Sequence, residues 1–113
     1  METPQTLNRI AELNDAFRAR CGQGGRILMT PAVACLPHDQ RARVMTACLT
    51  FKAFTPDNDP YGEHDFGKVR LYRQDWLWKI DYYADASCEY GSPDPSDPAQ
   101  TYRVMTVMHA NDW

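Results

Sequence analysis

The chain has 113 residues, of which 43% are hydrophobic and 24% are charged, and its formal net charge is −3. This length predicts a single domain over residues 1–113, and the hydrophobic content argues against a disordered chain. No apolar run reaches the roughly 18 residues of a membrane span, and the N-terminal residues do not resemble a signal peptide. We therefore expect a cytoplasmic protein.

The charges are distributed unevenly along the chain. Residues 1–52 carry seven basic and four acidic residues, whereas residues 53–113 carry five basic and eleven acidic residues. An acidic half disfavours direct contact with nucleic-acid phosphates and favours a basic partner or a cation. The alternative is that these acids only shape loops, where Asp is a common turn residue.

The four cysteines show no closely spaced pair, which argues against a structural zinc site. They are Cys21, Cys35, Cys48 and Cys88. We expect reduced thiols, with Cys48 acting as a small hydrophobic residue of the core.

The predicted elements begin with a helix over residues 4–20, where Pro4 suits the first turn. Apolar residues recur at three- and four-residue steps and form one stripe: Leu7, Ile10, Leu13 and Phe17. Glycines at 22, 24 and 25 end this helix. Residues 26–30 predict a short buried strand, and residues 31–37 predict a link that buries Val33 and Leu36.

A second helix is predicted over residues 38–52, because Pro56 prevents its continuation and apolar residues line one side. Two alternating runs follow, over residues 64–73 and 76–83, and predict an antiparallel hairpin with a turn at residues 73–75. Trp76, Trp78 and Ile80 share one face of the second run, and we expect at least Trp78 and Ile80 to pack against the stripe of the first helix.

Residues 84–99 predict a loop, because prolines at 93, 95 and 98 are incompatible with a helix. Residues 101–109 are rich in β-branched residues and predict a final strand, with a helix starting at Asp97-Pro98 as the alternative. The expected fold is α+β, with two helices packed on one face of a three- to four-stranded antiparallel sheet.

The segment from Asn58 to Gly67 is the most unusual part of the sequence. It places three acids, a histidine and two glycines around one proline, yet it matches no nucleophile, phosphate-loop or zinc motif. A divalent-metal site is one interpretation, with the ligands Asp57, Asp59, Glu63, His64 and Asp65. Acid–base catalysis by His64 paired with Asp65 or Glu63 is another. The third is that these polar side chains only shape the loop. We expect no cofactor, with a divalent metal as the alternative.

Asp81 lies in the middle of a predicted strand, on the face opposite the tryptophans. It is a surface charge if that face is exposed, and it joins the loop acids if a loop folds over it. The tyrosines, together with Trp78, give an aromatic content suited to a protein interface, although packing in the core and sheet is the favoured interpretation. The candidate partner-binding residues are Asp57, Asp59, Tyr61, Glu63, Asp65, Asp81, Asp85, Glu89 and Tyr90.

Several strings of this sequence resemble a family of small proteobacterial proteins, domain of unknown function 3768. They are Asn58–Gly67, Trp78–Tyr83, Tyr90–Pro95 and Arg103–Thr106, and the strings Asn14–Arg18 and Gly25–Pro31 fit the front half of the same family. The family has no assigned activity. The resemblance implies an origin on plasmids, phages or other mobile elements, which favours a role against host defence.

These observations support two functional hypotheses. The first is a binding protein of the anti-CRISPR or anti-restriction type, which inhibits a nucleic-acid-targeting defence system. It would place an acidic surface with aromatic edges against a basic surface of a host protein or complex, such as a CRISPR effector. This protein would contact neither nucleic acid nor membrane. The alternative is a small enzyme that uses Asp59, Glu63, His64 and Asp65, with or without a divalent metal.

Overall fold

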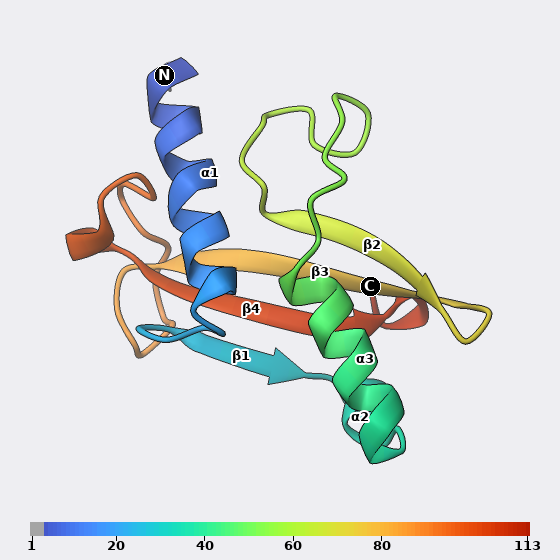
Figure 1. Cartoon of the computed structure of the whole chain (residues 1–113). Coiled ribbons are helices and arrows are strands. Elements are labelled where there is room, and N and C mark those ends of the chain that lie inside the picture. The colour runs from blue at the N-terminus through green and yellow to red at the C-terminus, as the bar shows by residue number, and fades with distance from the viewer. Residues whose placement is uncertain (1–3) are drawn as a thin grey trace.

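The fold of this protein is α+β, as the sequence predicts (Figure 1). The computed structural model describes residues 4–113. Its elements are α1 (Pro4–Ala19), β1 (Arg26–Met29), α2 (Pro31–Ala34), α3 (His38–Leu49), β2 (Phe66–Leu71), β3 (Gln74–Tyr83), β4 (Tyr102–His109) and the short 3₁₀ helices η1 (Pro98–Gln100) and η2 (Ala110–Asp112). No helix within the described range is long and apolar enough to span a bilayer.

The sheet has four strands in the order β1-β4-β3-β2. The β2–β3 and β3–β4 pairs are antiparallel, but β1 pairs parallel with β4, with Arg26 opposite Val104. The expectation of an entirely antiparallel sheet is therefore wrong at one edge. Two helices and a hairpin separate β1 from β4 along the chain, and such a long connection allows the chain to return in the same direction.

The segment that follows α1 differs from its prediction in two ways. β1 is an edge strand with exposed side chains at Leu28 and Met29, although its apolar sequence predicts a buried strand. Apolar composition does not distinguish a central strand from an edge strand, because the position of a strand in the sheet depends on which strands pair with it. The predicted link begins with the short helix α2, in which Pro31 occupies the first turn and Val33 is buried.

The hairpin turn consists of Tyr72 and Arg73, both with positive φ, at 58° and 60°. Positive φ at both central residues is the geometry that matches the twist of paired strands. The turn begins one residue earlier than the predicted turn at residues 73–75. The sequence did not indicate this position, because Tyr-Arg lacks the Asn-Gly composition that normally marks such a turn.

The core forms on the strand face that the alternation predicts. Trp76, Trp78 and Ile80 are buried with Met105 and Val107 of β4. Each of the three helices contributes to this cluster, in a set that comprises Phe17, Val33, Val44 and Cys48. Within the predicted stripe of α1, Ile10 and Phe17 are buried, whereas Leu7 and Leu13 are only half-buried.

The final segment is the strand β4, so the helical alternative for residues 101–109 is wrong. Helical structure near Asp97-Pro98 is limited to the single turn η1, where the Asp97 carboxylate accepts a hydrogen bond from Ala99 N. The four cysteines are free thiols, and Cys48 is fully buried.

Candidate binding surface and the polar network beneath it

Two acidic loops lie at the same end of the sheet (Figure 1). The first acidic loop, residues 55–65, enters β2 at the end where β3 leaves into the second acidic loop, residues 84–98. Asp65 O accepts a hydrogen bond from Ile80 N at 2.8 Å, and Gly91 forms an isolated bridge with Tyr83. Strand order therefore brings together two segments that β2 and β3 separate in sequence.

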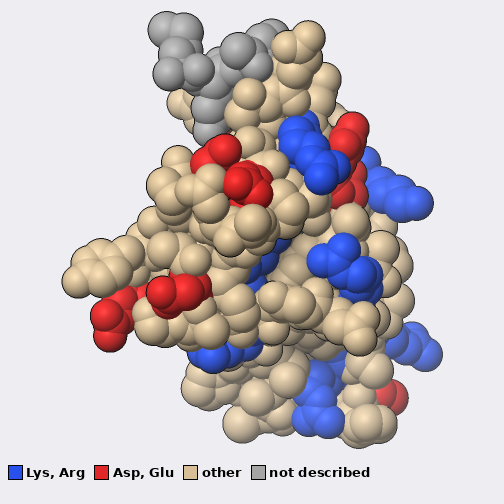
Figure 2. All heavy atoms as spheres, turned by 90° about the vertical axis from the view of Figure 1, so that its left-hand side faces the viewer, with Lys and Arg blue, Asp and Glu red and all other residues tan. Residues whose placement is uncertain are grey.

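The residues predicted for partner binding divide into two groups by exposure. Tyr61 and Tyr90 are 72% and 74% exposed, one on each loop. Three acids are also exposed: Asp57, Asp85 and Glu89. The remaining predicted acids are partly buried: Asp59, Glu63, Asp65 and Asp81. On the face shown in Figure 2, acidic side chains are interspersed with basic ones.

Several polar side chains of the loops are used to shape the backbone. Asn58 Oδ1 accepts from Thr55 N at 2.8 Å, and Asn58 Nδ2 donates to Ala53 O. Asp85 Oδ1 accepts from Ser87 N at 2.9 Å, and the Ser87 hydrogen bonds hold the pKa of this carboxyl below its ordinary value. These are local turn motifs of Asp and Asn, so part of the acidity has a structural use.

The two glycines of the Asn58–Gly67 motif are required for different structural reasons. Gly62 has a φ of 67°, a conformation that is strained for other residues. Gly67 lies directly against the Trp78 indole ring, and a Cβ atom at this position would overlap Trp78 Nε1. Both glycines are therefore explained by the backbone and by packing.

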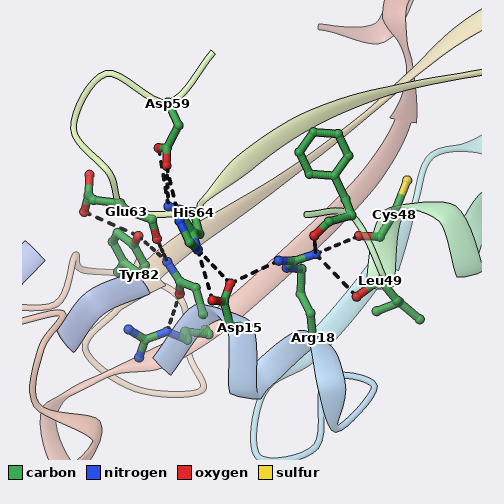
Figure 3. A network of polar contacts seen from close by, with 11 residues as sticks. Asp15, Arg18, Cys48, Leu49, Asp59, Glu63, His64 and Tyr82 are labelled. Atoms are coloured by element: carbon green, nitrogen blue, oxygen red, sulfur yellow. Dashed lines mark hydrogen bonds and ion pairs between the residues drawn. The ribbon is translucent and has the colours of Figure 1, made fainter. Parts of the chain in front are cut away.

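His64 lies between the carboxylates of Asp15 and Asp59 (Figure 3) and also contacts an aromatic ring. Its Nδ1 lies 3.0 Å from both carboxylate oxygens of Asp15, and its ring stacks on Phe54 with centroids 4.0 Å apart. The Asp59 carboxylate accepts from His64 N at 3.3 Å, and it lies 3.8 Å from His64 Nε2. The backbone of His64 has a φ of 55°, so these contacts stabilise a conformation that non-glycine residues seldom adopt.

Asp59 acts inside the first acidic loop rather than on its surface. Its side chain is only 7% exposed, and it accepts the backbone hydrogen bond of His64. The sequence pairs His64 with its neighbours Glu63 and Asp65, but the structure adds Asp15, which lies 49 positions earlier. Sequence spacing does not reveal this contact, because Asp15 is on a separate helix.

Arg18 is a second residue that sequence reasoning missed. Its side chain is 4% exposed, and its Nη1 donates to the carbonyl oxygens of Cys48, Leu49 and Phe51 at 3.1, 3.3 and 2.8 Å (Figure 3). The guanidinium lies 4.4 Å from the ring centroid of Trp78. Burial lowers the pKa of Arg18, and its 3.1 Å contact with Asp15 opposes that shift. Arg18 thus joins α1 to the C-terminal end of α3.

Asn14 connects both acidic loops to the helix. It is fully buried, and its Nδ2 donates to Glu63 O at 2.9 Å and to the Tyr82 hydroxyl at 2.8 Å. Its Oδ1 accepts from Arg103 Nε at 2.7 Å, and Arg103 Nη2 donates to Pro95 O at 2.7 Å. Glu63 belongs to the first loop and Pro95 to the second, so this chain of hydrogen bonds fixes one loop relative to the other.

Asp65 and Asp81 are electrostatic neighbours near the start of β2. Burial raises the pKa of Asp65, and the charges of Asp59 and Asp81 raise it further, while a backbone hydrogen bond opposes the shift. Asp81 pairs with Lys79 at 2.9 Å between Oδ2 and Nζ. Asp81 is therefore a partly exposed ion-pair residue that also influences Asp65.

No group of three or more His, Cys, Asp or Glu side chains within residues 4–113 is arranged to hold a metal ion. The predicted ligands are Asp57, Asp59, Glu63, His64 and Asp65. Asp59 and His64 lie together, with 3.8 Å between Asp59 Oδ2 and His64 Nε2, whereas Asp57 is exposed. Within this cluster, the geometry is that of an oriented imidazole held by carboxylates.

A cavity of about 760 Å³ lies beside this network, between α1 and the segment that follows α3. Asp15, Arg18, Phe54 and His64 line it, together with residues 49–52. Phe54 and His64 also line a smaller hollow of about 370 Å³, whose other wall includes Tyr61.

Comparison with protein families matched residues 29–112 to the family described as Protein of unknown function (DUF3768). The matched range contains both acidic loops and excludes α1, which supplies Asn14, Asp15 and Arg18. Comparison with curated proteins and with solved structures gave no match. Because the family model matches well over half of the length of this chain, the chain belongs to the DUF3768 family of proteins of unknown function.

Proposed function

We propose that this protein inhibits a nucleic-acid-targeting host defence system by binding a basic surface of one of its proteins, such as a CRISPR effector or a restriction enzyme. The observation that carries the proposal is the exposure of one large aromatic side chain on each acidic loop, Tyr61 and Tyr90. Tyr is enriched at protein interfaces, because its ring supplies contact area and its hydroxyl can form a hydrogen bond.

The charge of the two loops supports a basic partner. Residues 55–65 and 84–98 together contain eight acids and neither lysine nor arginine. Complementary charge accelerates association and selects among partners. The proposed contact surface consists of the exposed members of the predicted set: Asp57, Tyr61, Asp85, Glu89 and Tyr90.

The partly buried members of the predicted set have a supporting role in this proposal. Asp59 holds the backbone of His64, and Glu63 O is bound by Asn14. A surface that is fixed before binding loses less conformational entropy when the partner docks. The alternative of an enzyme at Asp59, Glu63, His64 and Asp65 receives less support, because the carboxylates beside His64 are engaged within the fold.

The choice of a defence system as the target rests on the resemblance to a family associated with mobile elements. The acids of the two loops are compatible with this choice, because proteins that bind nucleic acid carry basic channels. Occupation of such a channel would block the nucleic acid without any chemical reaction.

The test is a binding assay of the purified protein against a panel of CRISPR effector complexes and restriction enzymes. The triple variant Asp57→Lys, Asp85→Lys and Glu89→Lys should reduce the association rate by about tenfold or more, and added salt should reduce it in the wild type. Asp39→Lys is the matched control, because this exposed acid lies on α3, away from the loops.

Inhibition of the bound effector should fall in parallel with the association rate. The melting temperature of the triple variant should fall only slightly, because all three side chains are exposed and the hydrogen bonds that Asp85 loses lie within one exposed turn. Failure of the entire panel to bind, or binding that the triple variant retains, would refute the proposal. Activity that His64→Ala abolishes in a folded protein would favour the enzyme alternative instead.

A further inference from the structure

We propose that the cavity between α1 and residues 49–54 binds a small monocarboxylate with an apolar body. Its volume of about 760 Å³ lies within the range of roughly 300–1,000 Å³ that is typical of small-molecule sites. This cavity is distinct from the exposed loop residues assigned to partner binding, so the inference does not depend on the proposed function.

The walls of the cavity provide an apolar and aromatic surface. Leu49, Phe51 and Phe54 line one side, and Ala19 of α1 faces the same space. The Phe51 and Phe54 rings are in edge contact, with centroids 5.0 Å apart, and Phe54 stacks on His64. These contacts fix the aromatic wall, which suits a flat or aliphatic ligand body.

Most charged groups around the cavity are already paired with one another. The two oxygens of Asp15 face His64 Nδ1, and Asp15 Oδ1 also accepts from Arg18 Nη2. Arg18 Nη1 is engaged by three backbone carbonyl oxygens. A ligand group that competed for Asp15 would therefore have to displace existing hydrogen bonds.

One cation at the cavity has no acceptor. The exposed Lys52 side chain forms no ion pair or hydrogen bond within the described part of the chain. Arg18 Nε also lacks a hydrogen-bond partner, but this atom is buried out of reach of solvent and of a ligand. Lys52 is therefore the cationic group with which a ligand can pair, so an anionic ligand group complements the cavity better than a cationic one does.

A carboxylate is the anion of choice because the rest of the cavity is apolar. One carboxylate can pair with Lys52 while a ring or short alkyl chain packs on Phe51 and Phe54. An amine of the same shape would be repelled by Lys52, and an alcohol would gain no ion pair. The structure therefore predicts the order of affinity carboxylate, alcohol, amine.

The test is a titration of the full chain, monitored by backbone amide NMR shifts, with benzoate, benzyl alcohol and benzylamine. Benzoate should cause saturable shifts in residues 49–54 with a dissociation constant of about 1 mM or lower, whereas the alcohol and the amine should bind at least about tenfold more weakly. Equal binding of all three probes would overturn the proposal, as would the absence of saturable shifts with benzoate.

Two variants assign binding to this cavity. Lys52→Gln should weaken benzoate binding by about tenfold, and Lys68→Gln, at an exposed lysine of β2, should leave it unchanged.

Ala19→Leu places a larger side chain in the cavity from an exposed helix position and should abolish binding. Ala42→Leu is its control, because Ala42 is exposed on α3 and lines a different hollow. Benzoate binding that persists in both Lys52→Gln and Ala19→Leu would overturn the proposal.

Discussion

Asn14 and Arg103 lie 89 positions apart in the chain, yet Arg103 Nε donates a 2.7 Å hydrogen bond to Asn14 Oδ1. Both residues are buried, and burial lowers the pKa of Arg103. Through Asn14 the contact extends to Glu63 O, and through Arg103 to Pro95 O. A single buried amide therefore joins the first helix, the last strand and both acidic loops.

Replacement of Asn14 by Ala should destabilise the protein by about 3 kcal/mol, because it leaves buried donors and acceptors unpaired. Urea unfolding measures this loss, and hydrogen exchange should show faster opening in both loops. Asn8→Ala is the matched control, since it removes the same group from an exposed position of the same helix. Its effect should stay within about 0.5 kcal/mol. Equal stability of the two variants would contradict the role assigned to Asn14.

Replacement of Arg18 by Met should cost about 2–4 kcal/mol, because three carbonyl oxygens near the end of α3 lose their donor. Arg18→Lys should recover only part of the loss, since an ammonium cannot reproduce the planar fork over Trp78. Arg20→Met is the control, because Arg20 is exposed. Thermal melts of the three variants test the ranking, and a lysine variant as stable as the wild type would disprove it.

Replacement of Trp78 by Ala should cost about 3–5 kcal/mol, because a large aromatic side chain leaves the centre of the core. Trp113→Ala removes the same side chain where it is 71% exposed, although it contacts Phe66. That variant should lose less than about 1 kcal/mol. Chemical denaturation of both variants provides the comparison, and a loss below about 1 kcal/mol for Trp78→Ala would be inconsistent with this core.

Asp65 should make the folded protein less stable as the pH rises. Its pKa is raised in the folded state, chiefly by burial, so the folded protein holds this proton at pH values where the unfolded chain has lost it. The free energy of unfolding therefore falls as the pH increases from the ordinary aspartate pKa through the raised value. Asp65→Asn should remove this fall and increase stability at neutral pH.

Denaturant melts across the acidic range test this prediction for Asp65. Asp57→Asn is the control, because that side chain is exposed on the same loop. A pH profile for Asp65→Asn that matches the wild type, or lower stability at neutral pH, would show that the carboxylate is favourable in the folded state.

The four thiols should differ in reactivity. Cys48 is fully buried, and burial raises its pKa to about 12 despite the nearby charge of Arg18. Cys21 and Cys35 are exposed. Under native conditions at about pH 8, iodoacetamide should modify Cys21 and Cys35 while sparing Cys48, because the thiolate is the reactive form. Mass spectrometry detects the sites, denaturant should make Cys48 reactive, and rapid native labelling of Cys48 would contradict its burial.

The acidic motif illustrates where sequence reasoning stops. Its composition identifies the Asn58–Gly67 segment as unusual, and Gly62 and Gly67 each have a structural explanation that fits their residue type. The partners that organise it, Asn14 and Asp15, lie 49 positions before Glu63 and His64. A contact between distant segments has no local spacing, so a single sequence cannot reveal it.

The sequence by itself determined the α+β class, the two long helices, the strand face that carries Trp78 and Ile80, and the burial of Cys48. These features follow from periodicity and local stereochemistry, which neighbouring residues encode. Only the tertiary structure decided that β1 is an exposed parallel edge strand and which acids face inward. It also decided that Arg18 donates hydrogen bonds to carbonyl oxygens at the C-terminal end of α3 and just beyond it. These outcomes depend on which surfaces meet when the helices pack on the sheet, and that geometry is a property of the whole chain.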